Sequence, residues 1–191
     1  LLWGAELAMS KGDITRAEIL MEDVKDVLES DPGWHEARHL YWVFLVDVKG
    51  PLAKSRERLD ITQTIYEEAE RHARVLVNAE PESIQWLYCL SVSYERLGDI
   101  AVDRDNSEEA PKLYREALNI QQHLVELDED NTDFQRILSV SYNKLGDVAI
   151  KLDYTDQAAD LFDEALTIRQ QLVKLDENNA EWQRDLMASY G

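Results

Sequence analysis

The 191-residue sequence is poor in the residues that interrupt helices. It contains four prolines and seven glycines, and these two residue types are the strongest local breakers of regular structure. Their scarcity argues against a turn-rich β fold and favours long helices. Long apolar runs are also missing, because the longest candidate, residues 40–46, is far shorter than the roughly 18 residues of a membrane-spanning helix. We therefore expect no transmembrane segment.

Cysteine is nearly absent. Cys89 is the only one, so an internal disulfide is excluded. Because disulfides are rare in the reducing cytosol, a cytoplasmic location is the simplest expectation. Cys89 has no partner motif, and we expect a buried structural residue rather than a nucleophile. The sequence begins with Leu1 rather than methionine, so it supports no prediction about a targeting signal.

Positive charge is scarce as well. The chain has 20 Lys and Arg residues against 39 Asp and Glu residues, for a net charge of −19. Nucleic-acid binding depends on contacts between cations and phosphates, and anionic membrane surfaces attract basic segments. The charge therefore argues against nucleic acid and membrane surfaces as partners. It favours solubility and would steer a basic partner towards the chain.

What the sequence does contain is an internal repeat. Residues 90–100 read LSVSYERLGDI, and residues 138–148 read LSVSYNKLGDV. We call the separation of Gly98 and Gly146 the repeat interval; Trp86, Phe134 and Trp182 follow it too. Within each unit, two stretches carry apolar residues at alternating steps of three and four, which predicts two amphipathic helices.

Small residues predict that the two helices of a unit pack closely. Gly98 and Gly146 remove a side chain from the first helix. We expect an aromatic residue of the second helix, Tyr114 or Phe162, to fill the space.

Polar turns separate the predicted helices. Ser107 and Thr155 are predicted to be N-caps of the second helices, because their hydroxyl groups can accept hydrogen bonds from unpaired amides. The Asp- and Asn-rich segments 128–131 and 176–179 are predicted to end one unit and to begin the next.

The motif Tyr-x-x-Leu-Gly, followed by Ala-x-x-x-Tyr/Phe-x-x-Ala-Leu, resembles the tetratricopeptide repeat. It is carried by Tyr94, Leu97, Gly98, Ala110, Tyr114, Ala117 and Leu118, and again by Tyr142, Leu145, Gly146, Ala158, Phe162, Ala165 and Leu166. The family period is about 34 residues, whereas the period of this chain is about 48 residues. This longer period resembles the long-helix bacterial variants of the family.

The first half of the chain departs from this pattern. Tyr41 aligns with Tyr94 only at an offset that is five positions longer than the repeat interval, which predicts a longer hairpin loop near residues 50–55. The resemblance implies an all-α fold, a right-handed α–α superhelix of about nine helices. We expect one array over residues 1–191, cut from a longer protein, with a partial unit at 1–32, units at about 33–81, 82–131 and 132–179, and a truncated unit at 180–191.

The resemblance also implies a binding groove. In tetratricopeptide arrays the first helix of each pair lines a concave groove that holds a peptide or a partner's helix. The candidate peptide-binding residues are therefore the second stripe of the first helices: His35, His39, Trp42, Tyr88, Val92, Glu95, Asp99, Arg136, Val140, Asn143 and Asp147. The carboxylates of this stripe favour a basic and apolar partner segment.

Two further expectations concern the whole array. Stacking in such arrays is between neighbours, so apolar surface at the array ends favours self-association. The alternative function is that of a sensor or dimerisation arm in a larger bacterial signalling or effector protein.

Residues 35–39 read HEARH, which satisfies the H-E-x-x-H pattern of zinc metalloproteases. Such a site also needs a third protein ligand and an open coordination position. The acidic residues downstream have no flanking signature, so a zinc protease is only a minor alternative. We predict no catalytic residue, no metal and no cofactor, and we expect the histidine pair to face the groove or to pack between repeats.

Overall fold

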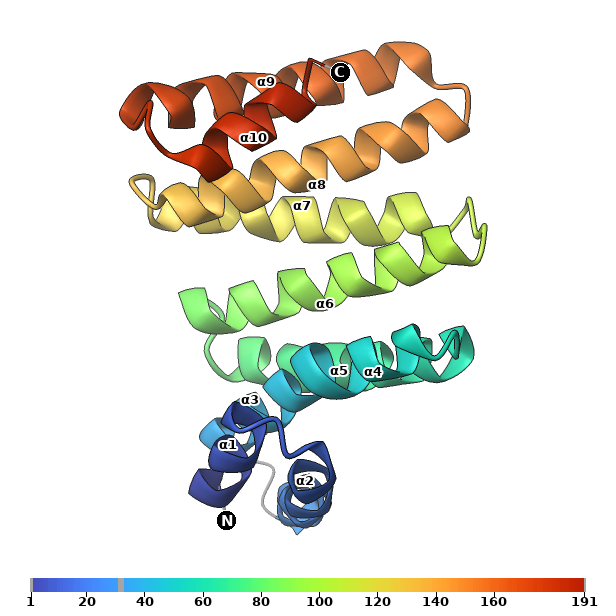
Figure 1. Cartoon of the computed structure of the whole chain (residues 1–191), viewed down its shortest axis with the longest axis vertical. Coiled ribbons are helices and arrows are strands. Elements are labelled where there is room, and N and C mark those ends of the chain that lie inside the picture. The colour runs from blue at the N-terminus through green and yellow to red at the C-terminus, as the bar shows by residue number, and fades with distance from the viewer. Residues whose placement is uncertain (1, 31–32, 191) are drawn as a thin grey trace. The chain divides into compact units, whose positions relative to one another are not determined.

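A computed structural model describes residues 2–30 and 33–190 (Figure 1). These residues form helices joined by short turns, without a β-strand among them. The elements are α1 (Leu2–Ser10), α2 (Ile14–Ser30), α3 (His35–Val43), the π-helix η1 (Phe44–Lys49), α4 (Gly50–Ser55), α5 (Leu59–Ala79), α6 (Ile84–Asp103), α7 (Ala110–Leu127), α8 (Thr132–Lys151), α9 (Thr155–Leu175) and α10 (Ala180–Ala188). Because α3, η1 and α4 are continuous, the described residues form nine helical segments, as predicted.

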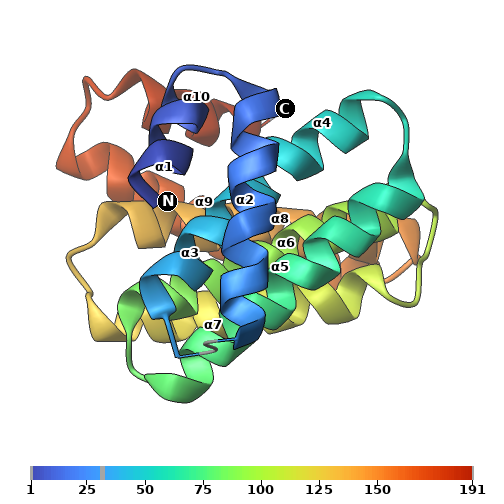
Figure 2. The same cartoon turned by 90° about the horizontal axis from the view of Figure 1, so that it is seen from below.

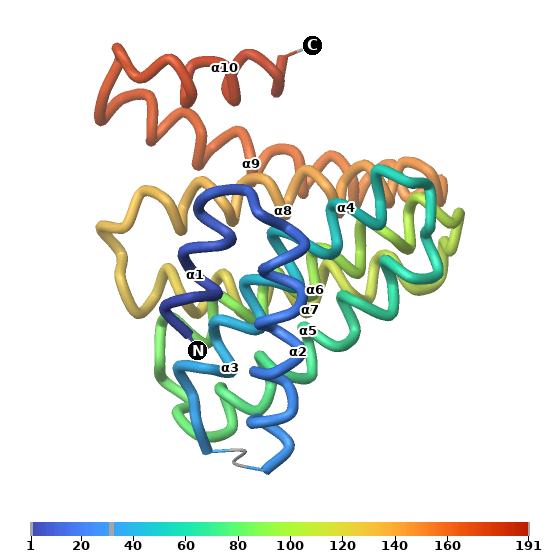
Figure 3. Tube along the Cα trace, turned by 60° about the horizontal axis from the view of Figure 1, so that its bottom comes forward, coloured from blue at the N-terminus to red at the C-terminus, as the bar shows by residue number. Residues whose placement is uncertain are grey.

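The chain divides into two compact units, Leu1–Ile100 and Ala101–Gly191. In the first unit α1 packs on α2, while α3 and α4 pack on α5 (Figure 2). In the second unit α8 packs on both α7 and α9, and α9 packs on α10 (Figure 3). Within each unit the trace reverses direction at the turns, so successive helices form antiparallel hairpins. None of the helices in the described part of the chain is long and apolar enough to cross a membrane.

The acidic turns begin new helices as the sequence predicts. The side-chain oxygen of Asn131 accepts a hydrogen bond from the Phe134 amide at 3.2 Å, which caps α8. Asn179 caps α10 in the same way, accepting from the Trp182 amide at 3.2 Å. Each cap satisfies an amide that has no partner within its helix.

The hairpin turns repeat in backbone conformation. Glu57, Asp105 and Asp153 each have a positive φ, of 56°, 54° and 61° respectively. They are separated by one repeat interval each, so the period of the sequence is also the period of the turn geometry. This left-handed residue lets the chain reverse after the first helix of each hairpin.

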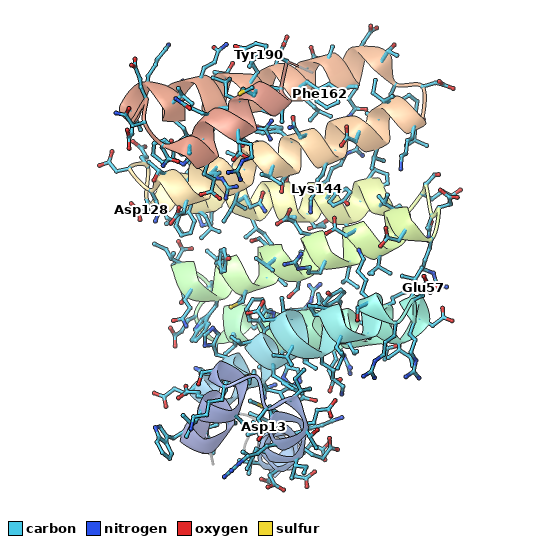
Figure 4. The ribbon with its side chains drawn as sticks, in the orientation of Figure 1. Asp13, Glu57, Asp128, Lys144, Phe162 and Tyr190 are labelled. Carbon is cyan, nitrogen blue, oxygen red and sulfur yellow. The ribbon has the colours of Figure 1, made fainter. Side chains whose placement is uncertain are left out.

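The predicted close approach is present in the α8–α9 hairpin. A Cβ atom added to Gly146 would lie 2.6 Å from the Phe162 ring, far inside van der Waals contact. Phe162 is labelled on α9 in Figure 4. The expected pairing of a glycine with an aromatic residue is therefore confirmed there. Gly50 has the same relation to Tyr66, which places Gly50 in the register of Gly146.

The predicted loop near residues 50–55 is wrong, because this stretch is helix α4. Gly50 and Gly98 are separated by one repeat interval, whereas the starts of α3 and α6 are one position further apart. One extra residue therefore lies between the start of α3 and Gly50. The π-helix Phe44–Lys49 absorbs it, because a π turn holds one more residue than an α turn.

The predicted N-caps Ser107 and Thr155 are also wrong. Helix α7 begins later than expected, at Ala110, and Ser107 lies in the preceding turn. Pro111 favours this start, because proline is well tolerated at the first helical positions. Thr155 is itself the first residue of α9, which has no side-chain cap.

Candidate peptide-binding surface

One hydrogen bond recurs between consecutive hairpins. A side chain of the second helix donates to a tyrosine hydroxyl 20 residues further along, in the next first helix or just after it. The bonds join Gln122 to Tyr142 (2.9 Å), Gln170 to Tyr190 (3.0 Å) and Arg74 to Tyr94 (2.6 Å). The three tyrosines follow the repeat interval, so this bond has the period of the sequence. Tyr94 and Tyr142 are partly buried, whereas Tyr190, just beyond the end of α10, is 66% exposed.

On α6 the predicted stripe stays accessible. Tyr88 is 37% exposed, and Val92, Glu95 and Asp99 are partly buried. Their spacing of three to four residues places them on one face of the helix. This face combines apolar side chains with carboxylates, as the sequence predicts.

Asp47 adds a carboxylate to this surface and is absent from the predicted set. Burial raises the pKa of its carboxyl group, and the charge of Arg96 opposes that rise. The negative charge of Asp47 in turn helps to raise the pKa of Tyr88, which burial raises most. Asp47 lies one repeat interval before Glu95, and this correspondence is the signal that identifies it.

On α8 two of the predicted residues line a pocket of about 360 Å³. The pocket lies between α8 and the end of α10, with α9 beneath it. Burial raises the pKa of the Asp147 carboxyl group, and the positive charge of Lys151 opposes this effect. The lining residues are Asn143, Asp147, Phe162, Asp163, Leu166, Ala188 and Ser189.

A buried arginine supports the wall of this pocket. Arg169 donates to the hydroxyl of Ser189 at 2.7 Å and to that of Ser139 at 3.3 Å. With its amide turned so that both groups are satisfied, the Asn143 oxygen accepts from Arg169 at 2.6 Å. Burial lowers the pKa of Arg169. Hydrogen bonds from Arg169 thus fix the positions of Asn143 and Ser189 in the pocket wall.

The remaining predicted residues of α8 differ in role. Arg136 forms ion pairs with Asp185 at 2.6 Å and with Glu181 at 3.0 Å, so its charge is already engaged by α10. Val140 is partly buried. Arg136 therefore links two first helices and offers little free charge to a ligand.

Two of the residues predicted on α3 and η1 belong to the core. Trp42 is buried and its indole N–H donates to the Ser93 hydroxyl at 2.8 Å. Val46 is buried as well. Their predicted exposure on a groove is wrong. The alignment of Tyr41 with Tyr94 uses an offset four positions longer than the separation between the starts of α3 and α6, so it assigned buried residues to the stripe.

The two histidines of the HEARH segment have separate partners. His35 lies 3.5 Å from the carboxylate of Glu80. His39 lies against the rings of Trp42 and Trp86, with centroid distances of 6.1 and 5.3 Å, and burial lowers its pKa. The separation of His39 and Tyr88 equals the separation between the starts of α3 and α6. His39 on α3 is therefore the counterpart of Tyr88 on α6.

The chemistry of a zinc site is not assembled around these histidines. Across residues 2–30 and 33–190, no three His, Cys, Asp or Glu side chains are grouped in a way that could hold a metal ion. Cys89 is buried, and burial raises the pKa of its thiol to about 12, so the reactive thiolate is suppressed.

Residues 139–172 match the family model described as the tetratricopeptide repeat. Comparison with curated proteins gives no match. BtubC (BKLC) from P. vanneervenii is similar in structure, with 23% identity and a TM-score of 0.61 over 97% of this chain and 68% of that one. TTC0263, a thermophilic TPR protein of Thermus thermophilus, has 13% identity and a TM-score of 0.50 over 99% of this chain and 96% of that one. These likenesses support the predicted all-α superhelix.

Proposed function

We propose that this chain, which carries tetratricopeptide repeats, binds a basic and apolar peptide or partner helix along the accessible face of its first helices. The fold is a scaffold for protein–protein interaction. The observation that carries the finer proposal is the pocket of about 360 Å³ between α8 and α10. It presents two carboxylates, Asp147 and Asp163, beside the apolar side chains of Phe162 and Leu166.

This lining suits a lysine or arginine side chain of the partner. The aliphatic stem of such a residue can pack on an apolar wall while its charged end reaches a carboxylate. Burial already raises the pKa of Asp147, so its charge is partly desolvated. A cation from the partner would stabilise the charged carboxylate and so offset the cost of its burial.

The charge of the chain supports the same kind of partner. A net charge of −19 steers a basic segment towards the surface before specific contacts form. The accessible face of α6 repeats the chemistry of the pocket, because Tyr88 and Val92 stand beside Glu95 and Asp99. We propose that each of these faces contacts a basic and apolar segment and that the role is non-catalytic.

A peptide-binding experiment tests this proposal. A labelled peptide of alternating lysine and leucine serves as the probe, and its counterpart with glutamate in place of lysine serves as the control. We expect Asp147→Lys to weaken binding of the basic peptide about tenfold or more, because it replaces an attraction with a repulsion. Fluorescence anisotropy at two salt concentrations measures the effect, and higher salt should weaken binding.

The matched control is Glu164→Lys, which makes the same charge change on the exposed surface of α9 outside the pocket lining. We expect it to alter affinity about threefold or less. Equal losses in the two variants, or equal binding of the acidic peptide, would overturn the proposed site. The sensor or dimerisation arm would then be the better interpretation.

A further inference from the structure

The unit Ala101–Gly191 contains a second pocket, of about 330 Å³. It lies between α7 and the start of α9, over the C-terminal half of α8. Its lining residues are Ser107, Glu108, Pro111, Lys112, Arg115, Leu145, Val148, Ala149, Leu152, Tyr154 and Gln157.

The two pockets open on opposite sides of the α8–α9 hairpin. On α8 the first pocket uses Asn143 and Asp147, whereas the second uses Leu145, Val148 and Ala149. Successive residues of a helix are rotated by about 100°, so these two sets point in roughly opposite directions. A ligand of the second pocket therefore does not compete for the groove-facing surface.

The late start of α7 accounts for this recess. Helix α9 begins at Thr155, and the residue one repeat interval earlier is Ser107, yet α7 begins only at Ala110. One turn of helix is thus missing where it would have covered α8. The buried side chains of Val148 and Ala149 line the space that remains.

The charge of this lining reverses that of the chain. Lys112 and Arg115 face a single lining carboxylate, Glu108, in a protein with about twice as many acidic as basic residues. Lys112 lies 3.6 Å from Glu109 in an ion pair that is exposed to solvent. Within the described part of the chain, the side chain of Arg115 makes no ion pair or hydrogen bond. Its charge is available to a ligand.

We propose that this pocket binds a segment of a partner protein that presents a bulky apolar side chain with a carboxylate beside it. The floor is apolar, the rim carries Arg115 and Lys112, and Tyr154 at the edge is 57% exposed. A volume of about 330 Å³ is at the small end of ligand pockets, as a single anchoring side chain requires. The hairpin then joins two partners of opposite charge, one on each side.

Binding of a matched pair of peptides tests the proposal. One peptide carries leucine and tryptophan flanked by glutamates, and the other carries the same apolar residues flanked by lysines. We expect the acidic peptide to bind the full chain and to shift backbone amide NMR signals within residues 107–115 and 145–157. Arg115→Glu and, separately, Lys112→Glu should each weaken this binding about tenfold.

Arg184→Glu is the control, because it makes the same charge change at an exposed residue of α10 outside the pocket. It should change affinity less than about twofold. Since the substituted side chains lie at the surface, circular dichroism should show unchanged helix content. The proposal fails if the acidic peptide does not bind, if its shifts fall between α8 and α10, or if both pocket variants bind like the wild type.

The groove variant separates the two proposals. Asp147→Lys should weaken the lysine–leucine peptide and leave the affinity of the acidic peptide for the second pocket unchanged. A loss of acidic-peptide binding in this variant would contradict two independent sites.

Discussion

Among single residues, Gly146 has the sharpest steric role. We expect Gly146→Ala to destabilise the second unit by about 1–3 kcal/mol, because the new methyl group would overlap the Phe162 ring. Chemical unfolding followed by circular dichroism measures the change. A second substitution, Phe162→Leu, should recover part of the loss in the double variant, because the smaller side chain leaves room.

Gly4→Ala provides the control for helix propensity. A Cβ atom at Gly4 would meet only the Leu20 side chain, at 3.6 Å, which is an ordinary contact. Alanine is favoured over glycine within a helix by about 1 kcal/mol, so this variant should be neutral or more stable. If Gly146→Ala were as stable as the wild type, the close packing would not be a constraint.

The sequence predicts some residues well and others not at all. The pair of Gly146 and Phe162 is predictable, because small and large side chains recur together at one interval. The role of Arg169 is not, because its hydrogen-bond partners are distant in sequence and lie on other helices. The role of Arg115 is not predictable from the sequence either, because only the structure shows that it lines a pocket.

At the scale of an element, the π-helix η1 holds one residue more than its counterparts. Deleting Val48 should convert this stretch to a regular α-helix, while the flanking helices keep their packing. We expect a loss of stability of less than about 2 kcal/mol, near the usual cost of a point mutation.

The comparison is deletion of Asn143 from the regular helix α8. There, all residues on one side of the gap rotate by about 100° relative to the core, so the second unit should unfold or lose most of its stability. Thermal melts of both variants give the result. Equal damage in the two helices would show that η1 does not accommodate an insertion.

Element boundaries are the hardest feature to predict. Helices and polar turns follow from apolar spacing and from Asn131 and Asn179, and these predictions are confirmed. The late start of α7 escapes prediction, because Ser107 before two acidic residues resembles a cap. In the structure it is the side-chain oxygen of Asn106 that accepts from the Glu109 amide in this turn, at 3.2 Å. The continuous helix through Gly50 escapes it too, because Gly-Pro is usually a sign of a loop.

For the molecule as a whole, net charge should govern stability. At low ionic strength 39 acidic residues repel one another more strongly in the folded state than in the expanded chain. We expect the melting temperature to rise as NaCl increases from about 20 to about 300 mM, by about 2–4 °C for each kcal/mol of repulsion screened. Sodium sulfate is unsuitable, because it also strengthens apolar burial.

Replacing two exposed carboxylates, through Asp160→Lys and Glu164→Lys, should reduce this salt dependence. A melting temperature that is independent of NaCl would contradict the expectation. Fold class is predictable at this scale because the repeat interval is a property of the whole chain. The ligand is not, because it depends on a few side chains whose rotation the period alone does not determine.

The recurring bond to the tyrosine hydroxyl has a consequence for how such a chain can change over generations. In the second unit, the α8–α9 hairpin accepts this bond from Gln122 through Tyr142 and donates the next one to Tyr190 through Gln170, at a constant separation of 20 residues. A duplication or exchange of whole repeat units therefore preserves these hydrogen bonds between hairpins without a compensating substitution. Insertions of other lengths must be absorbed inside a helix, as in η1.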